Sequence, residues 1–166
     1  MRKWIEKNAV GLTLLLVLAV MAMIFGFSCQ NGEESGRLSG TITKLLLRVF
    51  VPDYAALDPA RQQLLAERAG FFVRKAAHLT EFAFLGFSLM LHFKTLERRG
   101  MCRRPALLSL LVGFAYAASD ELHQILVSGR GPSLRDVGID CLGVFLAVIV
   151  CLLCAAARRN RTGSAG

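Results

Sequence analysis

The stretch AVGLTLLLVLAVMAMIFGF, residues 9–27, contains nineteen residues and no ionisable side chain. A helix needs about 20 apolar residues to cross the ~30 Å hydrocarbon core of a bilayer. The stretch therefore predicts a transmembrane helix and favours a membrane protein over a soluble one. The composition agrees, because the 166 residues have a mean hydropathy of +0.50 and only 19% of them are charged.

Three further apolar runs predict three more spans, over residues 76–93, 106–127 and 138–157. Each of these runs contains a few ionisable side chains. We expect an all-α fold: a single membrane domain over residues 1–166, built as a four-helix bundle. A short amphipathic extracytoplasmic segment, residues 28–75, would join the first two spans.

The distribution of Lys and Arg predicts the orientation of these spans. The N-terminal flank, the 94–104 loop and the C-terminal tail carry eleven basic residues against two acids, whereas segment 28–75 carries seven basic and five acidic residues. Basic flanks stay in the cytoplasm, so we expect a multi-pass protein of a plasma membrane with both termini cytoplasmic. The net charge of +8 follows from this asymmetry, and a nucleic-acid partner is not indicated. A lipoprotein signal ending at Cys29 is disfavoured because bulky Phe27 lies beside the cleavage position.

Segment 28–75 shows signs of two short helices. NGEESGRLSG, residues 31–40, is polar and glycine-rich and predicts a loop. TITKLLLRVF, residues 41–50, has one apolar face and predicts a helix that lies along the outer membrane surface or packs on the ends of the spans. Asp58 followed by Pro59 is typical of a helix start. We expect this helix to continue to about Arg68, with a break at Gly70 before the second span.

Polar residues recur at helical spacing inside the predicted spans. The second span has a stripe that includes His78 and Glu81, and the third has one around Asp120. An acid in hydrocarbon costs about 2.5–3.5 kcal/mol or more, so we expect the stripes to face each other and to meet in the outward half of the bundle. In the fourth span Asp140 lies one turn from Asp136. The small residues Gly143, Ala147 and Cys151 are spaced four apart and predict close helix packing.

Three motifs resemble the VanZ family, named for a protein associated with teicoplanin resistance. They are FGFSCQNGEESGRLSG at 25–40, RKAAHLTEFAFLGF at 74–87 and YAASDELHQILVSGRGPSLRDVGIDCLG at 116–143. The resemblance implies a bacterial cell-envelope membrane protein, and a link to glycopeptide susceptibility for some members. It supplies no reaction. The residues that it marks are Lys75, His78, Glu81, Asp120, Glu121, His123, Gln124, Arg130, Asp136 and Asp140.

The residues leave three hypotheses open. The polar network could be structural and fix helix register. It could bind a ligand, with Arg74, Lys75, Arg130 and Arg135 recognising the anionic head group of a membrane lipid or of a lipid-linked cell-wall precursor. The expected ligand-binding residues are Arg74, Lys75, His78, Glu81, Asp120, Glu121, His123, Gln124, Arg130, Asp136 and Asp140.

The third hypothesis is an enzyme that uses the same groups for acid–base chemistry. The candidate catalytic residues are His78, Glu81, Asp120, Glu121 and His123. Four of them, His78, Glu81, Asp120 and His123, are a permissible ligand set for a divalent metal, but no HExxH-type motif supports a metal site. The sequence indicates no cofactor and no oligomeric state.

Overall fold

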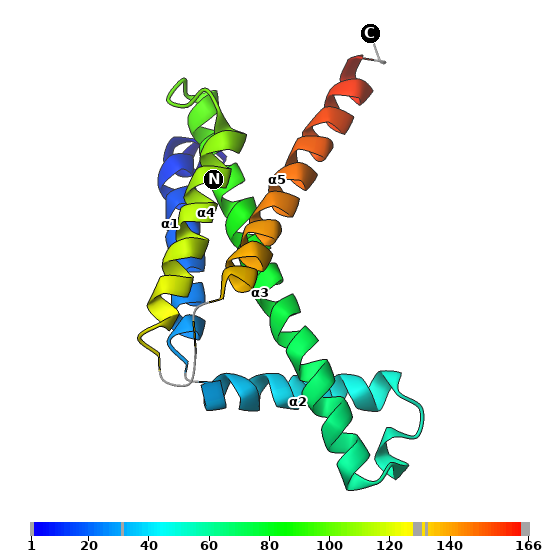
Figure 1. Cartoon of the computed structure of the whole chain (residues 1–166). Helices are drawn as coiled ribbons and strands as arrows, with labels where there is room; N and C mark the ends of the chain where they lie inside the picture. The colour runs from blue at the N-terminus through cyan, green and yellow to red at the C-terminus, as the bar shows by residue number, and fades with distance from the viewer. Residues whose placement is uncertain (1, 31, 128–130, 132, 164–166) are drawn as a thin grey trace.

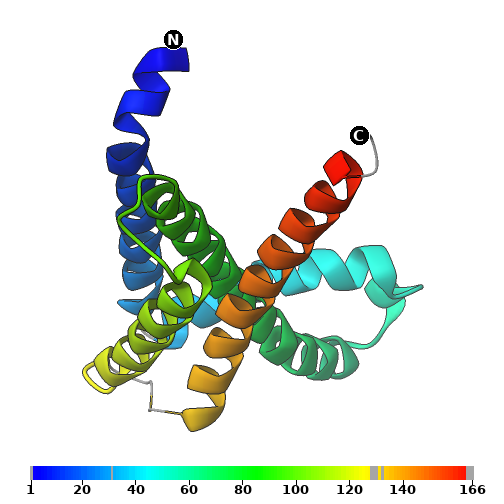
Figure 2. The same ribbon diagram turned by 90° about the horizontal axis from the view of Figure 1, so that it is seen from above.

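The computed structural model describes residues 2–30, 32–127, 131 and 133–163. The described elements are helical: α1 (Arg2–Ser28), α2 (Gly32–Phe50), the short 3-10 helix η1 (Tyr54–Ala56), α3 (Pro59–Arg98), α4 (Pro105–Gln124) and α5 (Leu134–Gly163). The predicted all-α class is confirmed. Helices α1, α3 and α4 pack together, α5 crosses α3 at an angle and points away from α1 toward its C-terminal end, and α2 lies across α3 (Figures 1 and 2).

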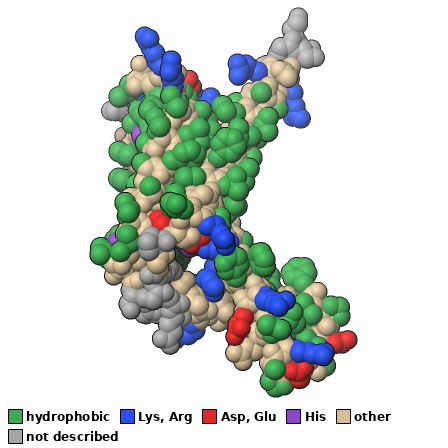
Figure 3. All heavy atoms as spheres, in the orientation of Figure 1, with side chains coloured by type: hydrophobic (Ala, Val, Ile, Leu, Met, Phe, Trp, Pro, Cys, Tyr) green, Lys and Arg blue, Asp and Glu red, His purple; other side chains and the backbone are tan. Residues whose placement is uncertain are grey.

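The connections of the four-helix part lie at two opposite ends. The start of α1, the α3–α4 connection and the end of α5 lie at one end, which we call the terminal end (Figures 1 and 2). Helix α2 and η1 lie at the other, which we call the α2 end. Apolar side chains cover most of the four-helix part, and charged side chains gather toward both ends (Figure 3).

Three described helices are long and apolar enough to cross a membrane: Asn8–Ser28 in α1, Pro59–Arg98 in α3 and Leu134–Arg161 in α5. Helix α4 is not among them, since Asp120 and Glu121 fall in the last turns of its 20 residues. The protein is therefore a candidate multi-pass membrane protein with three such helices.

The described core lies where the four long helices meet. Its fully or nearly fully buried members are Val17, Ile24, Phe82, Leu85, Leu89, Ala117 and Val144. The hydroxyl of Tyr116 donates a hydrogen bond to the carbonyl oxygen of Met21 at 2.6 Å and ties α4 to α1. The core thus lies beside the polar stripes and holds them in a fixed register.

Helices α3 and α5 approach closely through small residues. A Cβ added to Gly143 would lie 2.4 Å from the Leu79 carbonyl oxygen, and one added to Gly86 would lie 2.8 Å from the Val144 carbonyl oxygen and 3.0 Å from the Ala147 Cβ. The close packing predicted for Gly143 and Ala147 is confirmed.

The prediction of a loop over residues 31–40 is wrong, because α2 already begins at Gly32. The hydroxyl of Ser39 donates to the Ser35 carbonyl oxygen at 2.8 Å, and that of Thr43 donates to the Ser39 carbonyl oxygen at 2.7 Å. These bonds satisfy polar side chains within the helix. Ser39, Thr43 and Leu47 are buried at a spacing of four, so packing against α3 stabilises a segment that is polar in composition.

The predicted break at Gly70 is also wrong, since α3 runs unbroken for 40 residues, about 60 Å. Its start agrees with the prediction: Asp58 caps the helix by accepting a hydrogen bond from the Arg61 amide at 3.0 Å. A Cβ added to Gly70 would lie 3.7 Å from the Thr43 hydroxyl. The glycine is therefore a packing position at the crossing with α2 and not a helix terminator.

Candidate polar site

A cavity of about 230 Å³ opens near the α2 end of the four-helix part, with walls from α1, α2, α3 and α4. Four of the predicted site residues line it: Arg74, His78, Glu81 and Asp120. The stripes of α3 and α4 therefore meet here, as predicted. Asp120 is only 4% exposed and accepts a hydrogen bond from the Gln124 amide nitrogen at 3.2 Å, so Gln124 positions a carboxylate of the cavity wall.

Asp140 lies behind this cavity and is completely buried. Its Oδ1 is 3.6 Å from the Nδ1 of His78. Neither carboxylate oxygen, nor the His78 Nδ1, has a hydrogen-bond partner among the described residues. The contact joins α3 to α5, is an ion pair when the imidazole is protonated, and connects Asp140 to the cavity through the imidazole ring.

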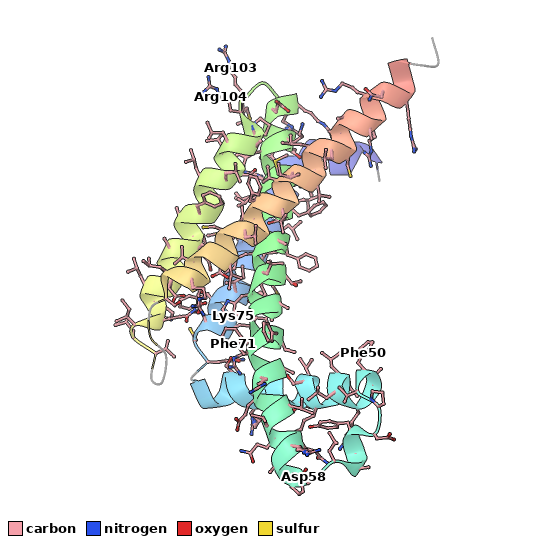
Figure 4. All side chains as sticks on the ribbon, turned by 45° about the vertical axis from the view of Figure 1, so that its right-hand side comes forward. Phe50, Asp58, Phe71, Lys75, Arg103 and Arg104 are labelled. Atoms are coloured by element: carbon pink, nitrogen blue, oxygen red, sulfur yellow. The ribbon has the colours of Figure 1, made fainter. Side chains whose placement is uncertain are left out.

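Lys75 and Asp136 form an ion pair between α3 and α5 closer to the α2 end. The ammonium nitrogen is 2.5 Å from the carboxylate, and both side chains are about one-fifth exposed. The same ammonium lies 5.3 Å from the centre of the Phe71 ring (Figure 4). Lys75 is therefore engaged within the protein and does not line the cavity, in contrast to its neighbour Arg74.

Glu121 joins α4 to the start of α5. One carboxylate oxygen accepts a hydrogen bond from the Ser133 amide at 2.5 Å, and the residue is 4% exposed. Glu121 and Ser133 line a different cavity of about 430 Å³. This places Glu121 apart from Asp120 despite their adjacency in the chain, because successive helix residues point about 100° apart.

His123 packs against the end of α1. Its Nε2 is 3.5 Å from the Cys29 sulfur, and its ring centre is 4.8 Å from that of Phe25. The described part of the chain gathers no three His, Cys, Asp or Glu side chains placed to hold a metal, so the hypothesised metal set that includes His123 is not assembled. Arg130 lies outside the described residues, and Arg135 is exposed.

Several wall residues were not predicted. The cavity is lined by Ser28 of α1, by Gln30 of the α1–α2 connection, and by Ser35 and Ser39 of α2. Ser28 is 3% exposed, and its hydroxyl oxygen has no hydrogen-bond partner among the described residues. The four-residue spacing from Ser35 through Ser39 to Thr43 is the signal that would have placed one face of α2 in the site.

The fold and this site define a multi-pass helical membrane protein with a buried polar cavity at one end of its bundle. The chain belongs to the VanZ/LLP1 family, whose family model matches residues 13–155. The match confirms the family resemblance and includes every residue that lines the 230 Å³ cavity. No curated protein and no solved structure matches the chain.

Proposed function

We propose that this cell-envelope protein crosses the bilayer four times, with both termini in the cytoplasm, and binds the head group of an envelope lipid in its outward-facing cavity. The observation that carries the proposal is the cavity lined by Arg74, His78, Glu81 and Asp120. Intramembrane ionisable residues generally mark a functional site. Here they line a space of about 230 Å³.

The arrangement of the helices supports the fourth span. Helix α4 packs against both α3 and α5, and residues 106–119 of it contain no Asp, Glu, Lys, Arg or His. Its two acids, Asp120 and Glu121, are each 4% exposed, so they do not face lipid. Arg103 and Arg104 lie at the terminal end (Figure 4), together with both ends of the chain, and basic residues favour the cytoplasmic side.

Cysteine labelling tests this orientation. We expect a variant with Cys29 as its sole cysteine to react with a membrane-impermeant maleimide on intact cells. Cys29 is exposed and belongs to the α2 end, which the proposal places outside. A variant with Cys102 alone, in the α3–α4 connection, should react only after the membrane is permeabilised. Labelling of Cys102 on intact cells, with Cys29 protected, would show the inverse topology.

The charges of the cavity favour a head group with two kinds of polar atom. The Arg74 guanidinium is a planar donor that suits a phosphate or carboxylate. The Glu81 and Asp120 carboxylates accept hydrogen bonds from hydroxyl or amine groups. A phospholipid with a polyol or amine head group has both features, and so does a lipid-linked cell-wall precursor. Binding such a lipid is the route by which we propose that the protein would affect glycopeptide susceptibility, including susceptibility to teicoplanin.

Native mass spectrometry of the detergent-purified protein tests the binding. We expect Asp120→Asn to lower retention of the co-purified lipid about tenfold, the effect of losing a charge-assisted hydrogen bond of about 1.5–3 kcal/mol. Arg103→Gln, which changes a charge at the terminal end, is the control and should keep the wild-type lipid content. Equal lipid retention by Asp120→Asn, Arg74→Gln and the wild type would refute the proposal.

A membrane-embedded acid–base enzyme is the second candidate. His78, Glu81 and Asp120 line one cavity, and such groups exchange protons with a bound substrate. The same spectra separate the two functions. If the lipid released from the wild-type protein has a changed mass, and the lipid released from Glu81→Gln has its original mass, the protein is an enzyme.

A further inference from the structure

A third cavity, of about 660 Å³, lies between α2, η1 and the first turns of α3. It shares Ser39 and Arg74 with the 230 Å³ cavity. Two further cations line it, Lys44 and Arg48 of α2. The three basic side chains therefore come from two crossing helices and share one space.

The charge of this cavity is predominantly positive. Glu67 is the one acid in its described lining, and an oxygen of its carboxylate accepts a hydrogen bond from the Gln63 amide nitrogen at 3.0 Å. Among the described residues, no carboxylate lies within ion-pair distance of Lys44, Arg48 or Arg74. Grouped cations without an acid partner attract an anion, and the guanidinium fork matches phosphate oxygens.

The position of α2 indicates where this anion comes from. Leu45, Val49 and Phe50 are 63%, 68% and 76% exposed on one side of the helix, whereas Lys44 and Arg48 face the cavity on another. A helix with an apolar face and a basic face lies in the membrane interface, with its apolar side chains among the acyl chains. Lipid phosphates lie at that depth. Phe50 lies at the far end of α2, away from the four-helix part (Figure 4).

We infer that Lys44, Arg48 and Arg74 form a binding site for the phosphate group of a membrane lipid. This inference rests on the proposed function for the outward placement of α2. Arg74 lines both cavities, so a phosphate held by it lies beside the head-group cavity. A lipid bound in this way would place its phosphate in the larger space and its polar head group next to Glu81 and Asp120.

The test compares two lipids on the purified full-length protein by native mass spectrometry. One is phosphatidylglycerol, and the other is an uncharged monoglucosyl diacylglycerol that lacks phosphate. We expect the double variant Lys44→Gln/Arg48→Gln to lose phosphatidylglycerol binding by about a hundredfold or more, because it removes two charge-assisted hydrogen bonds and each is worth a factor of about ten or more. Binding of the glycolipid should not change.

The matched control removes the same charge from the terminal end, Arg103→Gln/Arg104→Gln (Figure 4). The charge-conserving variant Lys44→Arg/Arg48→Lys should bind phosphatidylglycerol as the wild type does. Both substituted side chains are exposed, so the variants are expected to fold, which circular dichroism checks. An equal loss in the terminal-end control, or no loss in the double variant, would overturn the site. Displacement of the lipid by millimolar inorganic phosphate would identify free phosphate as the ligand and would overturn the assignment of a lipid phosphate to this site.

The two proposals can fail separately. If Asp120→Asn leaves lipid binding intact while Lys44→Gln/Arg48→Gln abolishes it, the head-group cavity is wrong and the phosphate site stands. If the reverse is found, the phosphate site falls and the proposed function stands.

Discussion

Gly143→Ala is expected to lower the free energy of unfolding by about 3 kcal/mol, the upper part of the range for overpacking a close contact. The added Cβ would lie 2.4 Å from the carbonyl oxygen of Leu79 and 3.0 Å from the amide nitrogen of Ala83. Both are backbone atoms of α3, so no flexible side chain can move aside. The helices must separate, and the Lys75–Asp136 and His78–Asp140 contacts would lengthen with them. Unfolding in dodecyl sulfate titrations of mixed micelles, followed by circular dichroism, measures the loss.

Gly138→Ala is the matched control on the same helix. A Cβ at Gly138 would meet no atom within 4 Å, and alanine favours a helix by about 1 kcal/mol over glycine. This variant should be as stable as the wild type or slightly more so. If Gly143→Ala and Gly138→Ala unfold alike, the close approach of α3 and α5 at Gly143 is not present in the protein.

His78→Leu is expected to destabilise the fold by about 3 kcal/mol, because removing one partner of a buried pair leaves the other charge uncompensated. Asp140 is completely buried, and His78 Nδ1 is the one described basic nitrogen within ion-pair distance, at 3.6 Å from its carboxylate. Replacing both residues, His78→Leu/Asp140→Leu, should recover most of the loss, since two apolar side chains need no pairing. The same unfolding measurement on the wild type, the two single variants and the double variant gives the coupling energy.

The comparison residue is His123, which is partly exposed and contacts Cys29 and Phe25 instead of a carboxylate. His123→Leu should change stability far less than His78→Leu. Additive effects of His78→Leu and Asp140→Leu would contradict the pairing. Strong coupling would show that the buried acid depends on the imidazole of the cavity wall.

Much of the fold could be predicted from the length and spacing of the apolar residues, because the hydrocarbon of a membrane requires helices there. The runs at 9–27, 76–93 and 138–157 had to be helical in hydrocarbon, where every backbone amide must be paired internally. Residues 31–40 and Gly70 were mispredicted for a shared reason. Local composition favours a loop and a break there, whereas packing between α2 and α3 determines the helix at both places, and that contact joins residues distant in sequence.

The site could be predicted as a set of residues but not as a set of partners. The spacing placed His78 and Glu81 on one face of α3 and Asp120 on a face of α4, and these three line one cavity. Spacing alone does not fix the rotation of one helix against another. Arg74 and Lys75 are neighbours in sequence, yet Arg74 lines both cavities and Lys75 pairs with Asp136. The same uncertainty placed His123 in a hypothetical metal set.

The unbroken α3 has a mechanical consequence. At about 60 Å it extends well beyond the ~30 Å hydrocarbon, and its apolar stretch, residues 76–93, adapts to a thinner bilayer by tilting. Helix α2 packs against α3, and α3 contributes residues to the walls of both cavities that contain Arg74. Tilting of α3 therefore moves these parts together. Bilayer thickness would then set how deep the basic cavity sits below the plane of the lipid phosphates, while the shape of the cavity stays the same.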